Sequence, residues 1–403
     1  MKPSNAIKTS LHCLCGFLLT AALAGFIGCA SVDTPAPQAA APAVVVQPAV
    51  APAPAPAAPA AAEQATPAPA TQAKPKIKIL ATGGTIAGAQ TSSSEVGYKS
   101  GSFSVDDLIK AVPHLNDLAD LTGEQVANIG SQTMNHEVWL KLANRVNEVL
   151  KGDDTDGVVI THGTDTMEET AYFLSLVVNS DKPVVLVGSM RPATAISADG
   201  PANLYNAVAL AANPEARGLG PLVVLNDEIH YAHEAQKMNS TSLNTFQSPN
   251  RGRAGVMNVG TVHFFSKNTT RHTTKSEFSV DGKTTNDLPR VDIIYSYANF
   301  GPDVVDFLVK QGVKGIVLAG VGDGNSTDAV IAALADAATN GVVVVRATRT
   351  GSGLVVRNVE VDDDKLGFIT SMELSPQKAR ILLMLGLIKT SDAKTLQQYF
   401  MEY

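Results

Sequence analysis

The chain has 403 residues, of which 45% are hydrophobic and 17% are charged, and its formal net charge is −7 at pH 7. This length and apolar content allow a large buried core, and the length favours two domains or more. The sequence contains neither a basic run nor a stripe of aromatic and basic residues, so nucleic acid is not expected as a partner.

Residues 1–29 have the pattern of an export signal. They contain two lysines, no acidic residue and an apolar run that ends in FIGC (26–29). Such a run is typical of a secretory signal peptide and is too short for a membrane span. FIGC resembles a bacterial lipoprotein box, in which Cys29 carries the lipid; simple cleavage near Ala30 is the alternative. All three cysteines lie in this leader, which suits export into an oxidising compartment. We therefore expect an exported, periplasmic protein that is tethered to the membrane if Cys29 is lipidated.

Residues 30–74 consist mostly of Ala, Pro, Val, Gln and Thr. Alternating Ala and Pro favours an extended spacer in the polyproline conformation and cannot build a packed core. We interpret this stretch as a linker that tethers a folded body, with a dispensable low-complexity tail as the alternative.

The rest of the chain alternates short apolar runs with amphipathic stretches. Most of the apolar runs are continuous, as expected for strands buried on both faces of a parallel sheet, and the β-α-β order predicts an α/β fold. We predict a larger N-terminal domain at 75–266, with a mainly parallel sheet flanked by helices, and a smaller C-terminal α/β domain at 290–403, joined by a polar linker at 267–289. The strand candidates are KIKIL (76–80), GVVIT (157–161), PVVLV (183–187), PLVVL (221–225), VDIIY (291–295), GIVLA (315–319) and VVVVR (342–346), and helices are expected at 136–151, 168–178 and 328–341.

Three of the predicted strands end in small-residue turns that carry polar side chains: ATGGT, HGTDT and GVGDGN. Ligands of open parallel sheets bind just beyond the carboxyl ends of the strands, so these turns are where a site is expected. The sequence has no phosphate loop, no HExxH helix and no GxSxG elbow, and GVGDGN is one residue short of the dinucleotide fingerprint. Threonine hydroxyls remain as candidate nucleophiles, and such a hydroxyl needs a base beside it. Asp165 follows Thr164 directly; it could act on that hydroxyl, cap the helix that follows, or do both.

The segments ATGGTIAG (81–88) and THGTDTMEETAYFL (161–174) resemble the two signature segments of the bacterial type II L-asparaginases. The resemblance runs from about Pro75 to Tyr403, with further support from NIGSQTMN (128–135) and VEVDDDK (359–365). It implies an amidohydrolase that converts L-asparagine and water into L-aspartate and ammonia without a metal or cofactor. It also implies a homo-oligomer, a tetramer, whose active sites are completed by a neighbouring subunit.

The resemblance assigns roles to matching residues. Thr85 would be the nucleophile, and Tyr98, in the segment TSSSEVGYKSG that follows, would accept its proton. Glu360 would pair with that tyrosine from a neighbouring subunit. Thr164, Asp165 and Lys237 would form a second set that either activates water or supports Thr85.

Substrate-binding roles follow from the same resemblance. Ser131 and Gln132 would hold the α-carboxylate, while Asp165 and Glu360 would hold the α-ammonium. Asn325 matches the residue found in asparagine-preferring members, so we expect an asparaginase with minor glutaminase activity.

Three of these side chains also have an ordinary interpretation. Tyr98 could be a plain loop aromatic, Lys237 a solvated surface lysine, and Glu360 part of a solvated acidic edge. A broader glutaminase-asparaginase is the alternative within the enzyme class. A tethered amino-acid binding protein without turnover is the alternative outside it.

Overall fold

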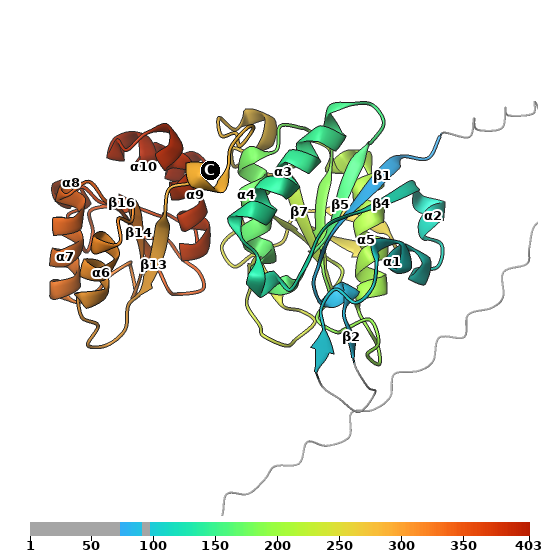
Figure 1. The fold of residues 1–403 in the computed structure, drawn as a ribbon, viewed down its shortest axis with the longest axis horizontal. Helices are drawn as coiled ribbons and strands as arrows, with labels where there is room; N and C mark the ends of the chain where they lie inside the picture. Colours follow the sequence, from blue (N-terminus) through green and yellow to red (C-terminus); the bar gives the residue numbers. More distant parts are fainter. Residues whose placement is uncertain (1–72, 91–96) are drawn as a thin grey trace, which may run out of the picture. The chain divides into compact units, whose positions relative to one another are not determined.

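The computed structural model describes residues 73–90 and 97–403 (Figure 1). The predicted leader, with Cys29, lies outside the described residues, as does all but the last two residues of the predicted linker. Tyr98 is described in its backbone only. In the described part of the chain, none of the helices combines the length and the apolar character needed to cross a bilayer.

The larger sheet has eight strands in the order β12-β11-β8-β7-β6-β5-β1-β4. Strands β4, β1, β5, β6 and β7 are parallel, whereas β8, β11 and β12 pair antiparallel at one edge. The strands are β1 (Lys76–Gly83), β4 (Asp120–Ile129), β5 (Gly157–Thr161), β6 (Val184–Val187), β7 (Pro221–Leu225), β8 (Glu228–Tyr231), β11 (Gly255–Asn258) and β12 (Thr261–Phe264). The predicted mainly parallel sheet is therefore confirmed, and the antiparallel edge adds to it.

Both faces of this sheet are covered by helices (Figure 1). Side chains of β1 alternate between the two faces: Ile77 and Ile79 belong to one apolar cluster and Leu80 to the other. Apolar side chains are needed at successive positions because each face has its own core. One face is covered by α1 (Val105–Ala111), α2 (Leu115–Leu118) and α5 (Gly200–Ala212), and the other by α3 (His136–Lys151) and α4 (Met167–Val177).

Helix α3 shows how the sequence sets an element and its packing. Asn135 caps it by accepting a hydrogen bond from the Val138 N–H over 3.1 Å, and the helix ends before Gly152. Its buried side chains recur at helical spacing, with Trp139, Leu142 and Val146 on the inner face. The observed bounds agree with the predicted ones.

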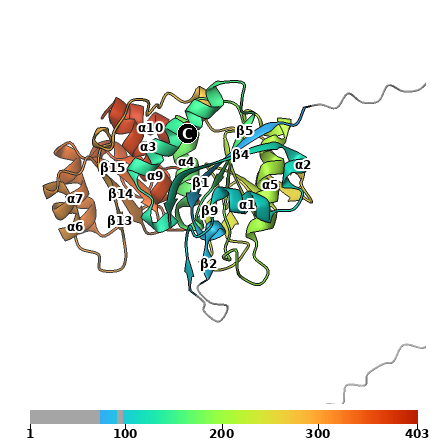
Figure 2. The same ribbon diagram turned by 45° about the vertical axis from the view of Figure 1, so that its right-hand side comes forward.

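The smaller sheet is parallel throughout, in the order β13-β14-β15-β16. One face packs on α6 and α7 and the other on α9, which also contacts α4 of the larger unit (Figure 2). This confirms the predicted smaller α/β domain. The elements are β13 (Val291–Tyr295), α6 (Asp303–Lys310), β14 (Gly315–Gly320), α7 (Asp328–Thr339), β15 (Val343–Thr348), α8 (Asp363–Leu366), β16 (Ile369–Thr370), α9 (Pro376–Lys389) and α10 (Ala393–Glu402).

The polar segment at 267–289 contains only two short 3₁₀ turns, Thr273–Lys275 and Thr285–Asp287. Its few apolar residues, Phe278, Val280 and Leu288, are buried in the same core as α4 and α9. The segment is therefore packed against the body although it lacks apolar periodicity.

Two short hairpins complete the described chain. β2 (Ala89–Gln90) pairs with β3 (Tyr98–Lys99), and β9 (Gln236–Lys237) pairs with β10 (Phe246–Gln247).

Candidate active site

Three neighbouring parallel strands, β4, β1 and β5, each end in a 3₁₀ turn that carries predicted site residues. The turns are Ser131–Thr133 after β4, Thr85–Ala87 after β1 and Thr164–Thr166 after β5. Because the carboxyl ends of parallel strands meet at one edge of the sheet, the three turns lie together. The Asp165 N–H donates to Ser131 Oγ over 3.1 Å, and the Thr166 hydroxyl donates to the Ser131 carbonyl over 2.8 Å.

Glycine is required where the turn at Thr85–Ala87 meets the turn at Thr164–Thr166. Gly83 and Gly84 have φ angles of 106° and 84°, which side-chain-bearing residues rarely adopt. A methyl group on Gly84 would overlap the backbone of Gly163, and one on Gly163 would lie 2.5 Å from Ser131 Oγ. The glycine pair before Thr85 therefore allows both the sharp turn and the close approach of the HGTDT loop.

A cavity of about 180 Å³ opens between these turns. Its lining includes Thr85, Ser131, Gln132 and Asp165, together with the backbone of Gly84 and Gly163. Thr85 is 8% exposed and Ser131 is 4% exposed, so two hydroxyls reach the cavity from well-packed positions. The structure thus brings four of the predicted residues to one small polar cavity.

Lys237 joins the other predicted residues of this site. Its ammonium Nζ donates to Thr164 Oγ1 over 2.9 Å and forms an ion pair of 2.6 Å with Asp165 Oδ1. The Lys237 side chain is only 15% exposed, so it is not a solvated surface lysine. The Asp165 carboxylate binds this ammonium and makes no capping hydrogen bond to the helix that follows. The capping interpretation of Asp165 is therefore wrong.

Glu168 holds the segment that carries Lys237. Glu168 is 4% exposed, and its carboxylate accepts hydrogen bonds from the Lys237 backbone N–H, over 2.5 Å, and from the Gln377 side-chain amide on α9. The buried Lys378 ammonium donates to the carbonyls of His233 and Ala235, each over 2.6 Å. Burial lowers the pKa of Lys378 to about 8. Helix α9 thus fixes the strand that delivers Lys237.

Sequence reasoning missed Glu168 and Lys378. Their roles depend on contacts between residues 69 and more than 140 positions apart, so no local pattern indicates them. For Glu168, the available signal was a second acidic residue directly after HGTDTM, and this is equally typical of an ordinary carboxylate in the first turn of a helix.

His162 fixes the HGTDT loop in a neutral form. Burial lowers its pKa to about 4, so the imidazole carries one proton at neutral pH. That proton lies on Nδ1, because Nδ1 is 2.6 Å from the Gly163 carbonyl, which can only accept. Nε2 then accepts from the Thr170 hydroxyl over 2.9 Å, and Thr170 Oγ1 accepts from the Trp139 indole over 2.9 Å.

Asn325 and Glu360 lie in the smaller sheet's unit and hydrogen-bond to one another. Neither lines the cavity that contains Thr85. Glu360 is exposed, and the side chain of Tyr98, its expected partner, lies outside the described part. Within one described chain, these two predicted residues are thus not brought to the Thr85 cavity.

A buried ion pair holds the two loops that carry Asn325 and Glu360. Arg346 and Asp363 are both fully buried and form two hydrogen bonds of 2.6 and 2.8 Å. The Arg346 guanidinium also donates to the Asp323 carbonyl, and Asp363 accepts from the Asn358 N–H. The pair therefore ties loop 321–325 to the segment before Glu360.

The described residues contain one group with metal-ligand spacing, His233, Glu234 and Glu373, whose ligand atoms lie within 4.8 Å of one another. The Arg251 guanidinium forms ion pairs with both carboxylates, and buried Lys378 adds a second positive charge nearby. These cations already neutralise the acidic oxygens, so the donor set suits an ion-pair network better than a divalent cation.

Comparison with known proteins links this geometry to one family. The sequence matches the family described as "Asparaginase, N-terminal" over residues 76–270 and the "Glutaminase/Asparaginase C-terminal domain" over residues 290–400. It is 52% identical over 330 residues to "L-asparaginase 2" of Bacillus subtilis (strain 168), covering 82% of this chain and 87% of that protein. It is 50% identical over 329 residues to "Probable L-asparaginase periplasmic" of Haemophilus influenzae, covering 82% and 93%.

The fold matches a solved structure as well. The structure described as "Crystal Structure of Probable Cytoplasmic L-asparaginase from Campylobacter jejuni" has a TM-score of 0.79 and 49% identity, covering 82% of this chain and all of that one. The names of the relatives thus include both a periplasmic and a cytoplasmic protein. Because both family domains match in order and relatives at about half identity align over most of their length, the chain belongs to the asparaginase/glutaminase family.

Proposed function

We propose that the protein hydrolyses L-asparagine to L-aspartate and ammonia through Thr85. One observation carries the proposal: Thr85, Ser131, Gln132 and Asp165 line one small polar cavity, and Asp165 also pairs with the Lys237 ammonium that holds Thr164. This set offers a nucleophile, groups for both charged ends of an amino acid, and a second hydroxyl beside a cation. The relatives named L-asparaginase support the same reaction.

In the proposed reaction, Ser131 and Gln132 bind the α-carboxylate while Asp165 binds the α-ammonium. Holding both ends fixes the side-chain amide over one hydroxyl, which lowers the entropic part of the barrier. Thr85 Oγ attacks the amide carbon and its proton passes to Tyr98; the C–N bond then breaks, and the departing nitrogen takes this proton and leaves as ammonia. Water then cleaves the resulting ester, which releases aspartate and restores the Thr85 hydroxyl. Backbone N–H groups in the turns that line the cavity would stabilise the oxyanion.

We further propose that a neighbouring subunit in a tetramer supplies Glu360 and Asn325. Support comes from their position: they pair with one another and line no part of the described Thr85 cavity. Thr164, Asp165 and Lys237 would then support Thr85 or activate the water from within the same chain.

The domain limits and the export route are also proposals. The limits 75–266, 267–289 and 290–403 are supported by family matches that leave residues 271–289 unmatched. Export to the periplasm, with lipid attachment at Cys29, rests on the leader pattern of residues 1–29 and on one relative that is named periplasmic. Labelling with a lipid precursor, with Cys29→Ala as control, tests the attachment.

The second candidate is a dual glutaminase-asparaginase, favoured by the family description of the C-terminal domain. Ammonia release from L-asparagine and L-glutamine, measured side by side on the purified protein, separates the candidates. Faster release from asparagine supports the proposed reaction, similar rates support the dual enzyme, and release from neither contradicts both.

A further inference from the structure

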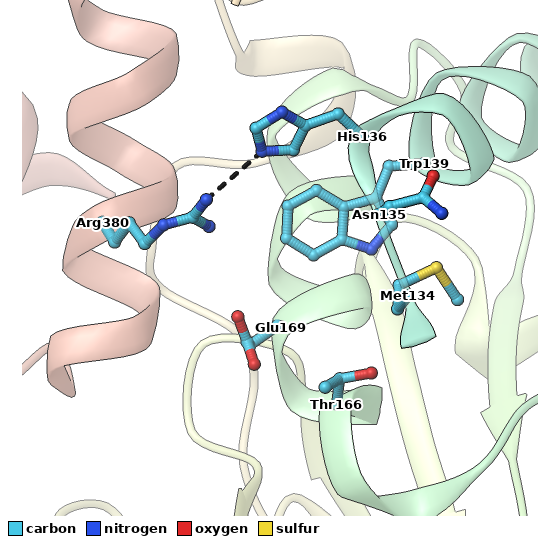
Figure 3. A pocket seen from close by; sticks show the side chains of 7 residues that line it. All are labelled: Met134, Asn135, His136, Trp139, Thr166, Glu169 and Arg380. Atoms are coloured by element: carbon cyan, nitrogen blue, oxygen red, sulfur yellow. Dashed lines mark hydrogen bonds between the residues drawn. The ribbon is translucent and has the colours of Figure 1, made fainter. Parts of the chain in front are cut away.

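A second cavity, of about 290 Å³, lies outside the Thr85 site, between the start of α3, the first turns of α4 and helix α9 (Figure 3). His136 and Trp139 of α3, Thr166 and Glu169 beside or on α4, and Arg380 of α9 contribute to its lining. This volume is close to the lower end, about 300 Å³, of cavities that hold small molecules, so only a small ligand fits.

The cavity is lined by one cation and one acid that do not pair with each other. The Arg380 Nε donates to the Val291 carbonyl over 2.9 Å, and its Nη2 is 3.3 Å from His136 Nε2. Since arginine only donates, His136 accepts this bond as a neutral imidazole, and burial lowers the pKa of His136 accordingly. Among the described residues, no carboxylate lies within ion-pair distance of Arg380.

Glu169 is the acidic residue that lines this cavity together with the Arg380 cation. Its carboxyl makes neither a hydrogen bond nor an ion pair within the described part of the chain. Burial, followed by the neighbouring Glu168 charge, raises the pKa of Glu169 to about 7, while Arg380 acts in the opposite direction. A partly buried carboxyl without a partner is costly to ionise, and a cation placed beside it would remove that cost.

Trp139 gives the cavity a rigid apolar wall. Its ring stacks on Phe173 with centroids 4.9 Å apart, and its indole N–H is held by Thr170. The cavity also shares a hydrogen-bonded turn with the Thr85 site, because the Thr166 hydroxyl donates to the Ser131 carbonyl.

We propose that this cavity binds a free α-amino acid, whose α-carboxylate pairs with Arg380 and whose α-ammonium pairs with Glu169. A zwitterion of this size satisfies both unpaired groups at once, whereas a simple anion or amine satisfies only one. The inference rests on the two unpaired charges and the cavity, and it does not depend on the reaction proposed for Thr85.

The chain's single tryptophan gives a direct test, since Trp139 lines this cavity. L-Aspartate, which has no side-chain amide to hydrolyse, is titrated into the full-length protein while Trp139 fluorescence is followed. We expect a saturable change, weakened about tenfold or more in Arg380→Gln and in Glu169→Gln, because each loses a charged hydrogen bond. Ser131→Ala, which alters the Thr85 cavity, should keep the signal, so failure of the proposed reaction would not remove it.

Arg217→Gln is the matched control, because Arg217 pairs with Asp181 at the surface. Succinate, which lacks the ammonium, and β-alaninamide, which lacks the carboxylate, should each bind at least about tenfold more weakly than L-aspartate. These two probes test the proposal on the unaltered protein even where a variant fails to fold. The proposal is overturned if L-aspartate up to millimolar concentrations leaves Trp139 fluorescence unchanged. It is also overturned if folded Arg380→Gln and Glu169→Gln bind as well as wild type, which would leave these groups a structural role only.

Discussion

Lys237 Nζ donates to Thr164 Oγ1 over 2.9 Å while it forms an ion pair with Asp165 Oδ1 over 2.6 Å. A single ammonium thus orients a hydroxyl and a carboxylate in the turn after β5. The arrangement links the strand that carries Lys237 to the turn that closes the Thr85 cavity. Removing the charge of Lys237 therefore tests the role of this arrangement in turnover.

Lys237→Met should lower kcat by about two to three orders of magnitude, because a preorganised cation beside the reacting groups is lost. The measurement is steady-state ammonia release from L-asparagine. Lys151→Met, at the exposed end of α3, is the control and should behave as wild type. A Lys237→Met enzyme within about threefold of wild type would contradict a catalytic role for this ammonium.

Glu168 is expected to act as a positioning residue. Glu168→Ala should lower kcat roughly tenfold or more with a smaller change in KM, since the backbone of Lys237 loses its acceptor. Glu168→Gln should recover most of the activity, because an amide oxygen can accept the same N–H. Equal damage from both substitutions, in proteins that fold, would show that the negative charge matters rather than the hydrogen bond.

Neutral His162 makes stability depend on pH. Burial lowers its pKa from 6.5 to about 4, so the unfolded chain binds this proton more readily than the folded one. The contribution of neutral His162 to the free energy of unfolding, on the order of 3 kcal/mol, is therefore complete above about pH 6.5 and is lost as the pH falls toward 4.

The measurement is urea unfolding at several pH values between 4 and 7. His162→Asn keeps a donor for the Gly163 carbonyl and should reduce the dependence on pH in this range, while His114→Asn, at an exposed position, should not. The same slope in wild type and in His162→Asn would exclude His162 as its source.

The buried pair Arg346–Asp363 should be far more sensitive to removal of one partner than of both. Arg346→Met alone leaves a buried carboxylate without its cation and should cost about 3–5 kcal/mol of unfolding free energy. The double variant Arg346→Met/Asp363→Leu should cost less, because no charge is left buried. Denaturant unfolding measures both, and a double variant that loses the sum of the two single effects would contradict the coupling.

Much of the fold was predictable because its signals are local. The continuous apolar runs of β5, β7 and β14 identify strands covered on both faces, and the observed α3 has the predicted bounds. The prediction missed β4, because it is an edge strand in which only Val126 is buried and polar residues interrupt the apolar ones. It also missed the antiparallel strands β8, β11 and β12, which mix polar and apolar residues, whereas β6 of the same length is apolar throughout.

The residues of the candidate site were likewise predictable only where their signals are local. Thr85 and Thr164 follow strands and glycine turns, so their placement beside the sheet edge could be predicted from position. The partners that orient them could not be predicted from local pattern. Lys237 comes from a two-residue strand and was assigned only through the family resemblance, and Glu168 acts through a backbone N–H far along the chain. Arg346 is the last residue of the predicted strand VVVVR (342–346), and its buried contacts with Asp363 show why a charge is there.

The central claim, that Thr85 is the nucleophile, is tested most directly by Thr85→Val, which replaces the hydroxyl with a methyl group of similar size. Ammonia release from L-asparagine is measured with the purified variant, and its thermal unfolding shows whether the fold is kept. We predict a fall in kcat of roughly a thousandfold or more with an intact fold, since the attacking hydroxyl is lost. A folded Thr85→Val protein that keeps activity within about tenfold of wild type would contradict the account.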